Sequence, residues 1–235
     1  MAPAPKSSSR NQLLRALSPG DLALLTPYLE RVVLELRQDV EKPHRPIKHI
    51  LFVEAGFVSV VARANGGRKV EVGIIGREGM TGLTVVMGND QSPHESYVQV
   101  AGEGTRLGSD DLRGAMDESK SMRLLFLHYA QAFMIQTAHT ALANGRASLE
   151  ERLARWLLMA HDRLDGDELP LIHDFLALML GVRRAGVTVA IHELETRGLI
   201  EGKRGRVAIL DREGLEEAAA GLYGTPEAEY ERLMA

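Results

Sequence analysis

The chain has 235 residues and carries 28 Lys and Arg against 32 Asp and Glu, a formal net charge of −4. This length suits two modest domains, and the slightly acidic balance excludes a polycation that binds nucleic acids without specificity. The sequence has no cysteine, which excludes disulfides, thiolate zinc sites, cysteine-bound iron–sulfur clusters and thiol redox switches.

The N-terminal sequence lacks the features of a membrane or secretory segment. Residues 1–12, MAPAPKSSSRNQ, are polar and predict a short disordered tail. The chain contains no apolar run of about 18 residues, the length that a membrane-spanning helix requires. We therefore expect a cytoplasmic protein with no membrane partner.

The first half of the chain predicts a short helix followed by strands. Ser18-Pro19-Gly20-Asp21 has a capping serine, a proline in the first turn and an acid near the positive helix end, so a helix is expected to about Leu29. Residues 32–107 are β-rich, with glycine turns such as residues 65–67, and predict an antiparallel barrel or roll. Ser109 is expected to cap a further helix.

A long helical run without Gly or Pro follows from about Ser121 to Asn144. Small and apolar positions recur within it at alternating steps of four and three residues, the spacing of a two-stranded coiled coil. A second subunit is expected to pack there, and the alternative is that the stripe lies on the β domain of its own chain. The predicted dimer-interface residues are Leu127, Gln131, Met134, Ala138 and Ala141.

The rest of the chain predicts a second, helical domain. After a break at Gly145 and Ser148, a helix should place Leu153, Trp156, Leu157 and Ala160 on one side and its charges on the other. The C-terminal stretch from Leu210 predicts one helix and an acidic tail. We expect a tail and short helix at 1–17, a β-roll sensor domain at 18–117, a dimerisation helix at 118–146 and a DNA-binding domain at 147–235.

Residues 171–210 predict a winged helix-turn-helix. A first helix would end at Gly181, where the chain must turn. The second helix should bury a stripe at i, i+3, i+4 and i+7 and turn its other side outward. The buried stripe would consist of Val187, Ala190, Ile191 and Leu194, and the outward residues would be Arg184, Ala185, Thr188, Val189, His192 and Thr196.

A basic β-hairpin completes this motif. The strands LIEG and VAIL enclose Lys203, Arg204, Gly205 and Arg206, a turn that places three cations near DNA phosphates. Residues 181–210 hold six Lys or Arg against three Asp or Glu, a local charge of +3 in an acidic chain. The alternative is an ordinary helical hairpin with solvated arginines, and the order of the features favours DNA binding.

A β domain with the segment GREGMTGL, a long helix, the segment ERLARWLL and a winged helix-turn-helix, in that order, resembles the Crp/Fnr superfamily of bacterial transcription regulators. The resemblance implies an α+β fold with an N-terminal double-stranded β-roll related to cyclic-nucleotide-binding domains, a central dimerisation helix and a C-terminal winged helix-turn-helix. It also implies a homodimer on palindromic DNA with half-sites about 34 Å apart, contact with RNA polymerase and a site for an effector whose identity stays open.

The ligand site departs from the family pattern. In relatives that bind cyclic AMP, a glutamate in a glycine-rich cassette holds the ribose, and an arginine followed by Ser-Ala holds the phosphate. Here Glu78 is retained, but residues 93–96, PHES, lack the arginine. We expect a degenerate pocket without cyclic nucleotide, haem or metal. The candidate pocket residues are Glu78, Gly79, Met80, His94, Glu95, Ser96 and Thr137.

The recognition helix also departs from the family pattern. The three positions that hold Arg, Glu and Arg in typical members correspond to Arg184, Ala185 and Val189 here. Arg184 suits a bidentate pair with guanine, and the two apolar residues suit thymine methyl groups. Each half-site should therefore contain a guanine flanked by thymines. Further expected DNA contacts are Arg183, Thr188 and His192 on the helix and Lys203, Arg204 and Arg206 on the wing.

Two other function classes compete with regulation. The sequence contains no GxxxxGK[ST] phosphate loop, GxSxG nucleophile turn or HExxH metal pair, so an enzyme is not expected. A ligand-binding or scaffolding dimer without specific DNA binding is the alternative, and the salt dependence of DNA affinity distinguishes it from a regulator.

Overall fold

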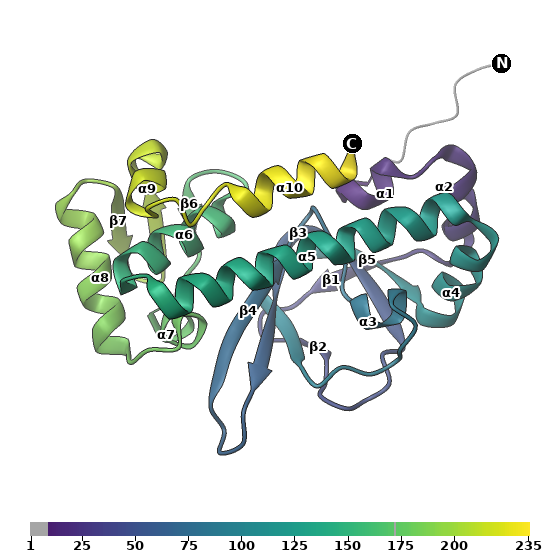
Figure 1. The fold of residues 1–235 in the computed structure, drawn as a ribbon, viewed down its shortest axis with the longest axis horizontal. Coiled ribbons are helices and arrows are strands. Elements are labelled where there is room, and N and C mark those ends of the chain that lie inside the picture. Colours follow the sequence, from purple (N-terminus) through teal and green to yellow (C-terminus); the bar gives the residue numbers. More distant parts are fainter. Residues whose placement is uncertain (1–8, 172) are drawn as a thin grey trace. The chain divides into compact units, whose positions relative to one another are not determined.

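The structure is a computed structural model that describes residues 9–171 and 173–235 (Figure 1). The chain divides into two compact units. Unit 1 comprises the described residues up to Val60, together with Ile75–Phe133 and Tyr230–Ala235; unit 2 comprises Val61–Ile74 and Met134–Glu229. A hairpin from the β-rich region therefore groups with the C-terminal helices.

Strands and helices are largely segregated along the chain, as is typical of an α+β fold. The elements are α1 (Gln12–Ala16), α2 (Pro19–Leu25), η1 (Thr26–Tyr28), β1 (Glu30–Leu34), β2 (Asp39–Glu41), β3 (His49–Arg63), β4 (Lys69–Ile75), α3 (Leu83–Val86), β5 (Glu95–Gly108), α4 (Ser109–Glu118), α5 (Lys120–Arg146), α6 (Leu149–His161), β6 (Glu168–Leu169), α7 (His173–Leu180), α8 (Arg184–Thr196), β7 (Ile200–Lys203), β8 (Arg206–Ile209), α9 (Arg212–Ala218) and α10 (Thr225–Met234).

The predicted antiparallel β domain is confirmed. Its sheet has the strand order β1-β5-β3-β4, and β2 also pairs with β5. The β1–β5 register runs from Glu30 opposite Arg106 to Leu34 opposite Gly102. The turn between β3 and β4 has Gly66 and Gly67 at positive φ, as the sequence predicted.

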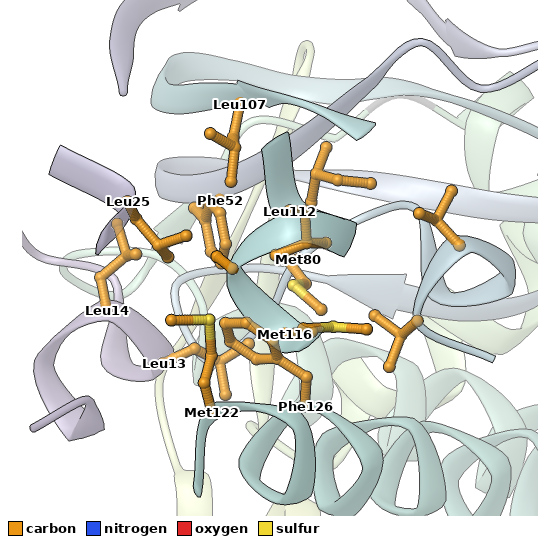
Figure 2. Packing of buried hydrophobic residues seen from close by; sticks show 14 of the residues in the cluster. Leu13, Leu14, Leu25, Phe52, Met80, Leu107, Leu112, Met116, Met122 and Phe126 are labelled. Carbon is orange, nitrogen blue, oxygen red and sulfur yellow. The ribbon is translucent and has the colours of Figure 1, made fainter. Parts of the chain in front are cut away.

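The core of unit 1 is built from the N-terminal helices, the sheet, α4 and the start of α5 (Figure 2). Phe52 of β3 and Phe126 of α5 lie at its centre with ring centroids 6.0 Å apart and tilted by 46°, a favourable geometry for aromatic pairs. Leu13 and Leu14 of α1 are buried in the same cluster. The N-terminal helix is thus a structural part of this unit.

Helix α5 is one uninterrupted helix (Figure 1), longer at both ends than the sequence predicted. Gly145 lies inside it, and the break comes at Ser148. Ser148 caps α6 through a capping box with Glu151, because each side chain accepts a hydrogen bond from the other's backbone N–H.

Four expectations about local structure are corrected. Asn11, which the sequence placed in a disordered tail, is fully buried and donates hydrogen bonds to the carbonyls of Val53 and Gly79, both at 2.8 Å. Residues 1–8 of that tail lie outside the described residues. Ser109 is not a helix cap, because its hydroxyl donates to the carbonyl of Ile47 at 2.6 Å.

The other two corrections concern the helical part. Arg155 lies buried in α6, where the sequence predicted a charged outer side. Its guanidinium donates to the carbonyls of Leu222 at 3.1 Å and Gln136 at 3.5 Å, and burial lowers its pKa. The expected acidic tail is also wrong, because residues 225–234 form α10.

Candidate nucleic-acid interface and effector cassette

The turn between α7 and α8 has the geometry that the sequence predicted. Gly181 has φ +62°, a left-handed conformation that favours glycine. Its N–H donates to the carbonyl of Leu178, and the N–H of Val182 donates to the carbonyl of Ala177 at 3.0 Å. These two bonds form a Schellman motif, which ends α7 and aims the chain into α8.

Helix α8 buries one stripe and exposes the opposite one, as expected from the helix period. Val187, Ala190, Ile191 and Leu194 are at most 4% exposed. The outward residues are all exposed, and Val189 reaches 58% exposure. An apolar side chain this exposed on a helix has room to contact a thymine methyl group. The exposed residues are Arg184, Ala185, Thr188, Val189, His192 and Thr196.

The N-terminus of α8 has no side-chain cap. Arg183 occupies the capping position, and its side chain makes no capping hydrogen bond. Arginine has no side-chain acceptor to offer, and the N–H groups of Gly186 and Val187 donate to the carbonyl of Arg183 instead, at the positive end of the helix dipole. A phosphate oxygen is the group that such an end accommodates.

The wing is a tight hairpin of the predicted kind. Strands β7 and β8 pair with Lys203 opposite Arg206, and Gly205 takes a φ of +79° in the turn. Strand β6 joins the other side of β8 and completes a three-stranded sheet. The wing and α8 therefore belong to the same small domain within unit 2.

Ion pairs reduce the positive charge of the wing. Lys203 pairs with Glu201 at 2.6 Å, and Arg206 pairs with Glu168 at 3.0 Å. Among the described residues, no carboxylate forms an ion pair with Arg204 at the tip. We therefore expect Arg204 to contribute most of the wing's attraction to phosphate, because a cation already neutralised by a neighbour releases fewer counterions from DNA.

The β3–β4 hairpin packs on this helical domain within unit 2. The indole N–H of Trp156 in α6 donates to Oε1 of Glu71 in β4 at 2.5 Å, and both side chains are buried. Val70 of the same strand comes within 3.4 Å of the point where a Cβ would stand on Gly181. The hairpin thus touches both α6 and the turn of the helix-turn-helix.

The predicted pocket residues Glu78, Gly79 and Met80 lie in unit 1 and are engaged by the chain itself. The carboxylate of Glu78 accepts a hydrogen bond from the N–H of Gly76 at 3.1 Å. A Cβ on Gly79 would stand 1.9 Å from the hydroxyl of Tyr129. The side chain of Met80 is fully buried in the core (Figure 2). We call residues 76–82 the cassette.

A carboxylate that the sequence analysis did not single out joins the cassette to β5. Oε1 of Glu41 accepts a hydrogen bond from the N–H of Gly82 at 2.6 Å, and Glu41 stands opposite Ser96 in the β2–β5 pair. Burial raises the pKa of Glu41, against the opposing influence of the Gly82 bond and the Ser96 hydroxyl. A side-chain oxygen of this protein thus already accepts from the backbone N–H beside the candidate pocket.

The remaining pocket candidates are dispersed. Glu95 begins β5, Ser96 is buried and His94 is half-buried just before them. Nδ1 of His94 has no hydrogen-bond partner among the described residues. Thr137 belongs to unit 2. The assignment of these residues to a pocket stays a prediction. The sequence analysis did not single out Asn11, Glu41, Tyr129 and Tyr230, which contact the cassette.

Two other kinds of site are absent from the part of the chain that the structure describes. Within residues 9–171 and 173–235, no group of three or more His, Asp or Glu side chains is arranged to hold a metal ion. In the same residues, no helix is both long enough and apolar enough to cross a membrane.

Comparisons with known proteins agree with this geometry. Residues 151–218 match the family described as "Crp-like helix-turn-helix domain". Comparison with curated proteins gave no match. Solved structures with the same fold include FixK2 from Bradyrhizobium japonicum, at 15% identity and a TM-score of 0.71, covering 81% of this chain and 96% of that one.

Two further solved structures are similar. The c-di-GMP-responsive global regulator CLP of Xanthomonas campestris is 19% identical with a TM-score of 0.63, over 82% of this chain and 99% of that one. A CRP-family transcriptional regulator from Thermus thermophilus is 18% identical with a TM-score of 0.66, over 82% and 97%. These structural similarities show that the chain shares the fold of the three proteins, and the match of residues 151–218 agrees with the helix-turn-helix that the sequence predicted.

Proposed function

Because residues 151–218 are a Crp-like helix-turn-helix domain in a chain with the Crp/Fnr regulator fold, we propose that the protein is a transcription regulator that binds a palindromic operator as a homodimer. In this role it binds double-stranded DNA in the cytoplasm, contacts RNA polymerase and catalyses no reaction. The observation that carries the proposal is the exposed face of α8 next to the cationic wing.

The outward side chains of α8 suit a major groove. Arg184 has the donors for a bidentate pair with guanine, worth about 1–3 kcal/mol of discrimination. Ala185 and Val189 offer only methyl groups, which favour contact with thymine. Arg183, Thr188 and His192 flank these positions and are proposed to contact bases or phosphates. The operator half-site therefore contains a guanine flanked by thymines.

The apolar stripe of α5 supports dimerisation. Leu127 is 39% exposed and Met134 is 63% exposed, and Gln131, Ala138 and Ala141 are exposed between and beyond them. Leu124, at 54% exposure, extends the same spacing by one step. Exposed apolar side chains in register favour a second copy of the helix, and a two-fold dimer presents two α8 helices to two half-sites about 34 Å apart.

The engaged cassette supports DNA binding without an added effector. The stretch 93–96 has no arginine to pair with a cyclic phosphate, and Glu41 already bonds the N–H of Gly82. A phosphate brought there would find this N–H already bonded by a side chain of the protein and no Arg to pair with. The related CLP protein is c-di-GMP-responsive; for this chain we propose a degenerate pocket that takes neither a cyclic nucleotide nor a metal.

The test is selection of random DNA duplexes by the purified protein without ligand, at two salt concentrations. The expected result is a two-fold symmetric site with a guanine in each half and an affinity that falls steeply with salt. Arg184→Ala should lose the preference for guanine and weaken specific binding by about 5- to 150-fold. Arg31→Ala, a change of the same kind on β1, is the control.

Other results separate the alternatives. A strong preference that survives Arg184→Ala would refute its role, and an asymmetric single site would refute the dimer. Met134→Glu should shift the protein toward monomer in sedimentation experiments, whereas Val33→Glu, which also places a charge on an exposed apolar residue, should not. Stable dimers that enrich no sequence, even in cell extract, would favour the scaffolding function.

A further inference from the structure

The last six residues of this chain belong to unit 1. Helix α10 starts in unit 2, but its last residues, Tyr230–Ala235, belong to unit 1. The match to the Crp-like domain ends at residue 218, so α10 lies beyond the matched residues. Figure 1 draws α10 in yellow, with its end beside α1.

Polar contacts hold this segment at the cassette. The hydroxyl of Tyr230 lies 2.8 Å from the carbonyl oxygen of Glu78 and 3.1 Å from Oε1 of Gln12. Both partners are acceptors, so the hydroxyl is the donor, and its proton bonds the closer carbonyl. A residue at the C-terminus therefore donates to the backbone of the cassette.

The end of α10 is also capped from α5. Nδ1 of His128 lies 3.0 Å from the carbonyl oxygen of Leu233. A carbonyl only accepts, so His128 carries its proton on Nδ1 in this contact. The carbonyl is one of the last four of the helix, which lack partners within it. His128 thus provides a hydrogen-bond partner for the carbonyl of Leu233, which is within its reach only when segment 230–235 is packed in unit 1.

Apolar contacts complete the docking surface. Tyr230 and Met234, four residues apart and so on one face of α10, both pack against the core cluster that contains Phe52 and Phe126. Segment 230–235 therefore covers part of the core edge and contacts the cassette at the same time. The residues of this segment are half-buried or exposed, and such segments open locally at a lower free energy than a packed core.

We propose that residues 230–235 form a reversible strap that stabilises the cassette and couples it to the DNA-binding domain. Because the strap and the domain are joined through α10, a displacement of either acts on the other. By linkage, DNA binding changes strap docking as much as strap docking changes DNA affinity. The coupling step rests on the proposed function, whereas the stabilisation of the cassette does not.

Amide hydrogen exchange of residues 76–82 without DNA tests the first step. Tyr230→Phe removes the hydroxyl and keeps the ring, so cassette exchange should rise about two- to tenfold, the range for one lost hydrogen bond. A chain ending at Glu229 should show a larger rise. Tyr28→Phe, on an exposed tyrosine in unit 1, should leave exchange unchanged. An unaltered cassette in Tyr230→Phe would overturn the proposal, whether or not the shortened chain folds.

The same measurement with a selected DNA duplex tests the coupling. In the full chain, DNA should change cassette exchange at least about twofold, and Tyr230→Phe should reduce that change. An equal change in both proteins would overturn the coupling and leave the stabilisation standing. Failure to bind any duplex would count against the proposed function alone, because the experiment without DNA does not depend on it.

Discussion

The surface proposed to read DNA and the cassette are built in opposite ways. Helix α8 and the wing come from one continuous segment, 184–209, and their functional side chains point outward. The cassette is also a short segment, but contacts from far along the chain hold it: Asn11, Glu41, Tyr129 and Tyr230. The surface is therefore open to a partner, whereas the cassette is occupied by its own chain.

This difference explains which site tolerates change. Surface substitutions away from packed or bonded groups alter stability by about 0.5 kcal/mol or less, so α8 is free to change its DNA preference without unfolding. In the cassette, each substitution disturbs a partner on another element. Four variants test this contrast.

Gly79→Ala should have the largest effect on stability. The added Cβ would stand 1.9 Å from the hydroxyl of Tyr129, and the buried ring must move. Overpacking of this kind costs about 1–3 kcal/mol, measured as a loss in the free energy of unfolding. Gly114→Ala is the control, because its Cβ meets nothing within 4 Å in helix α4. Equal stability of the two variants would contradict the packing argument.

Glu71→Ala should destabilise unit 2 by about 1–3 kcal/mol, because it leaves the buried indole N–H of Trp156 without its acceptor. Trp156 is the only tryptophan in the chain, so its emission reports directly on this contact. The emission of the folded protein should change in Glu71→Ala and less in Glu71→Gln, which keeps a carbonyl acceptor. If the emission of both variants equalled that of the unchanged protein, the hydrogen bond from Trp156 to Glu71 would not influence the indole.

Glu41→Gln should change how stability depends on pH. The pKa of Glu41 is raised by burial in the folded state above its ordinary 4.5, so the unfolded chain loses the proton first as pH rises. The folded state then binds more protons, and stability falls from about pH 4.5 upward. The glutamine variant should lack this decline. If the free energy of unfolding of the wild type rose relative to that of the variant over this pH range, the stated direction of the Glu41 pKa shift would be wrong.

Arg204→Ala should have the smallest effect. Loss of one phosphate contact weakens binding to every sequence alike and lowers the salt slope by about 0.9. Lys203→Ala should lower the slope less, because Lys203 is already paired with Glu201. A change of sequence preference in either variant would mean that the wing contacts bases.

The sequence predicted the burial pattern of α8 and its flanking turns correctly because these signals are local. The burial of Val187, Ala190, Ile191 and Leu194 follows from the helix period, and the turns at Gly181 and Gly205 follow from the conformations that glycine favours. The proposed dimer stripe of α5 was read from spacing in the same way. Its residues are exposed, and their pairing with a second copy stays a prediction.

In other parts of the chain, the local sequence pattern gave a wrong prediction or none. Arg155 looked like a solvated charge, but the carbonyls of Leu222 and Gln136 lie within reach of it. The C-terminal stretch looked like an acidic tail, although Tyr230, Leu233 and Met234 have the spacing of a helix face. No local pattern pointed to Glu41, because its hydrogen-bond partner, the N–H of Gly82, is far away in the sequence.

The sequence by itself determined the fold class, the order of the elements and the outward face of α8, because periodicity, caps and turn residues act over a few positions. Only the tertiary structure decided that Glu41 and Tyr230 engage the cassette, that Glu71 pairs with Trp156 and that segment 230–235 packs in unit 1. A buried polar group must find a hydrogen-bond partner, and in this chain that partner often stands dozens of residues away, where no short pattern records it.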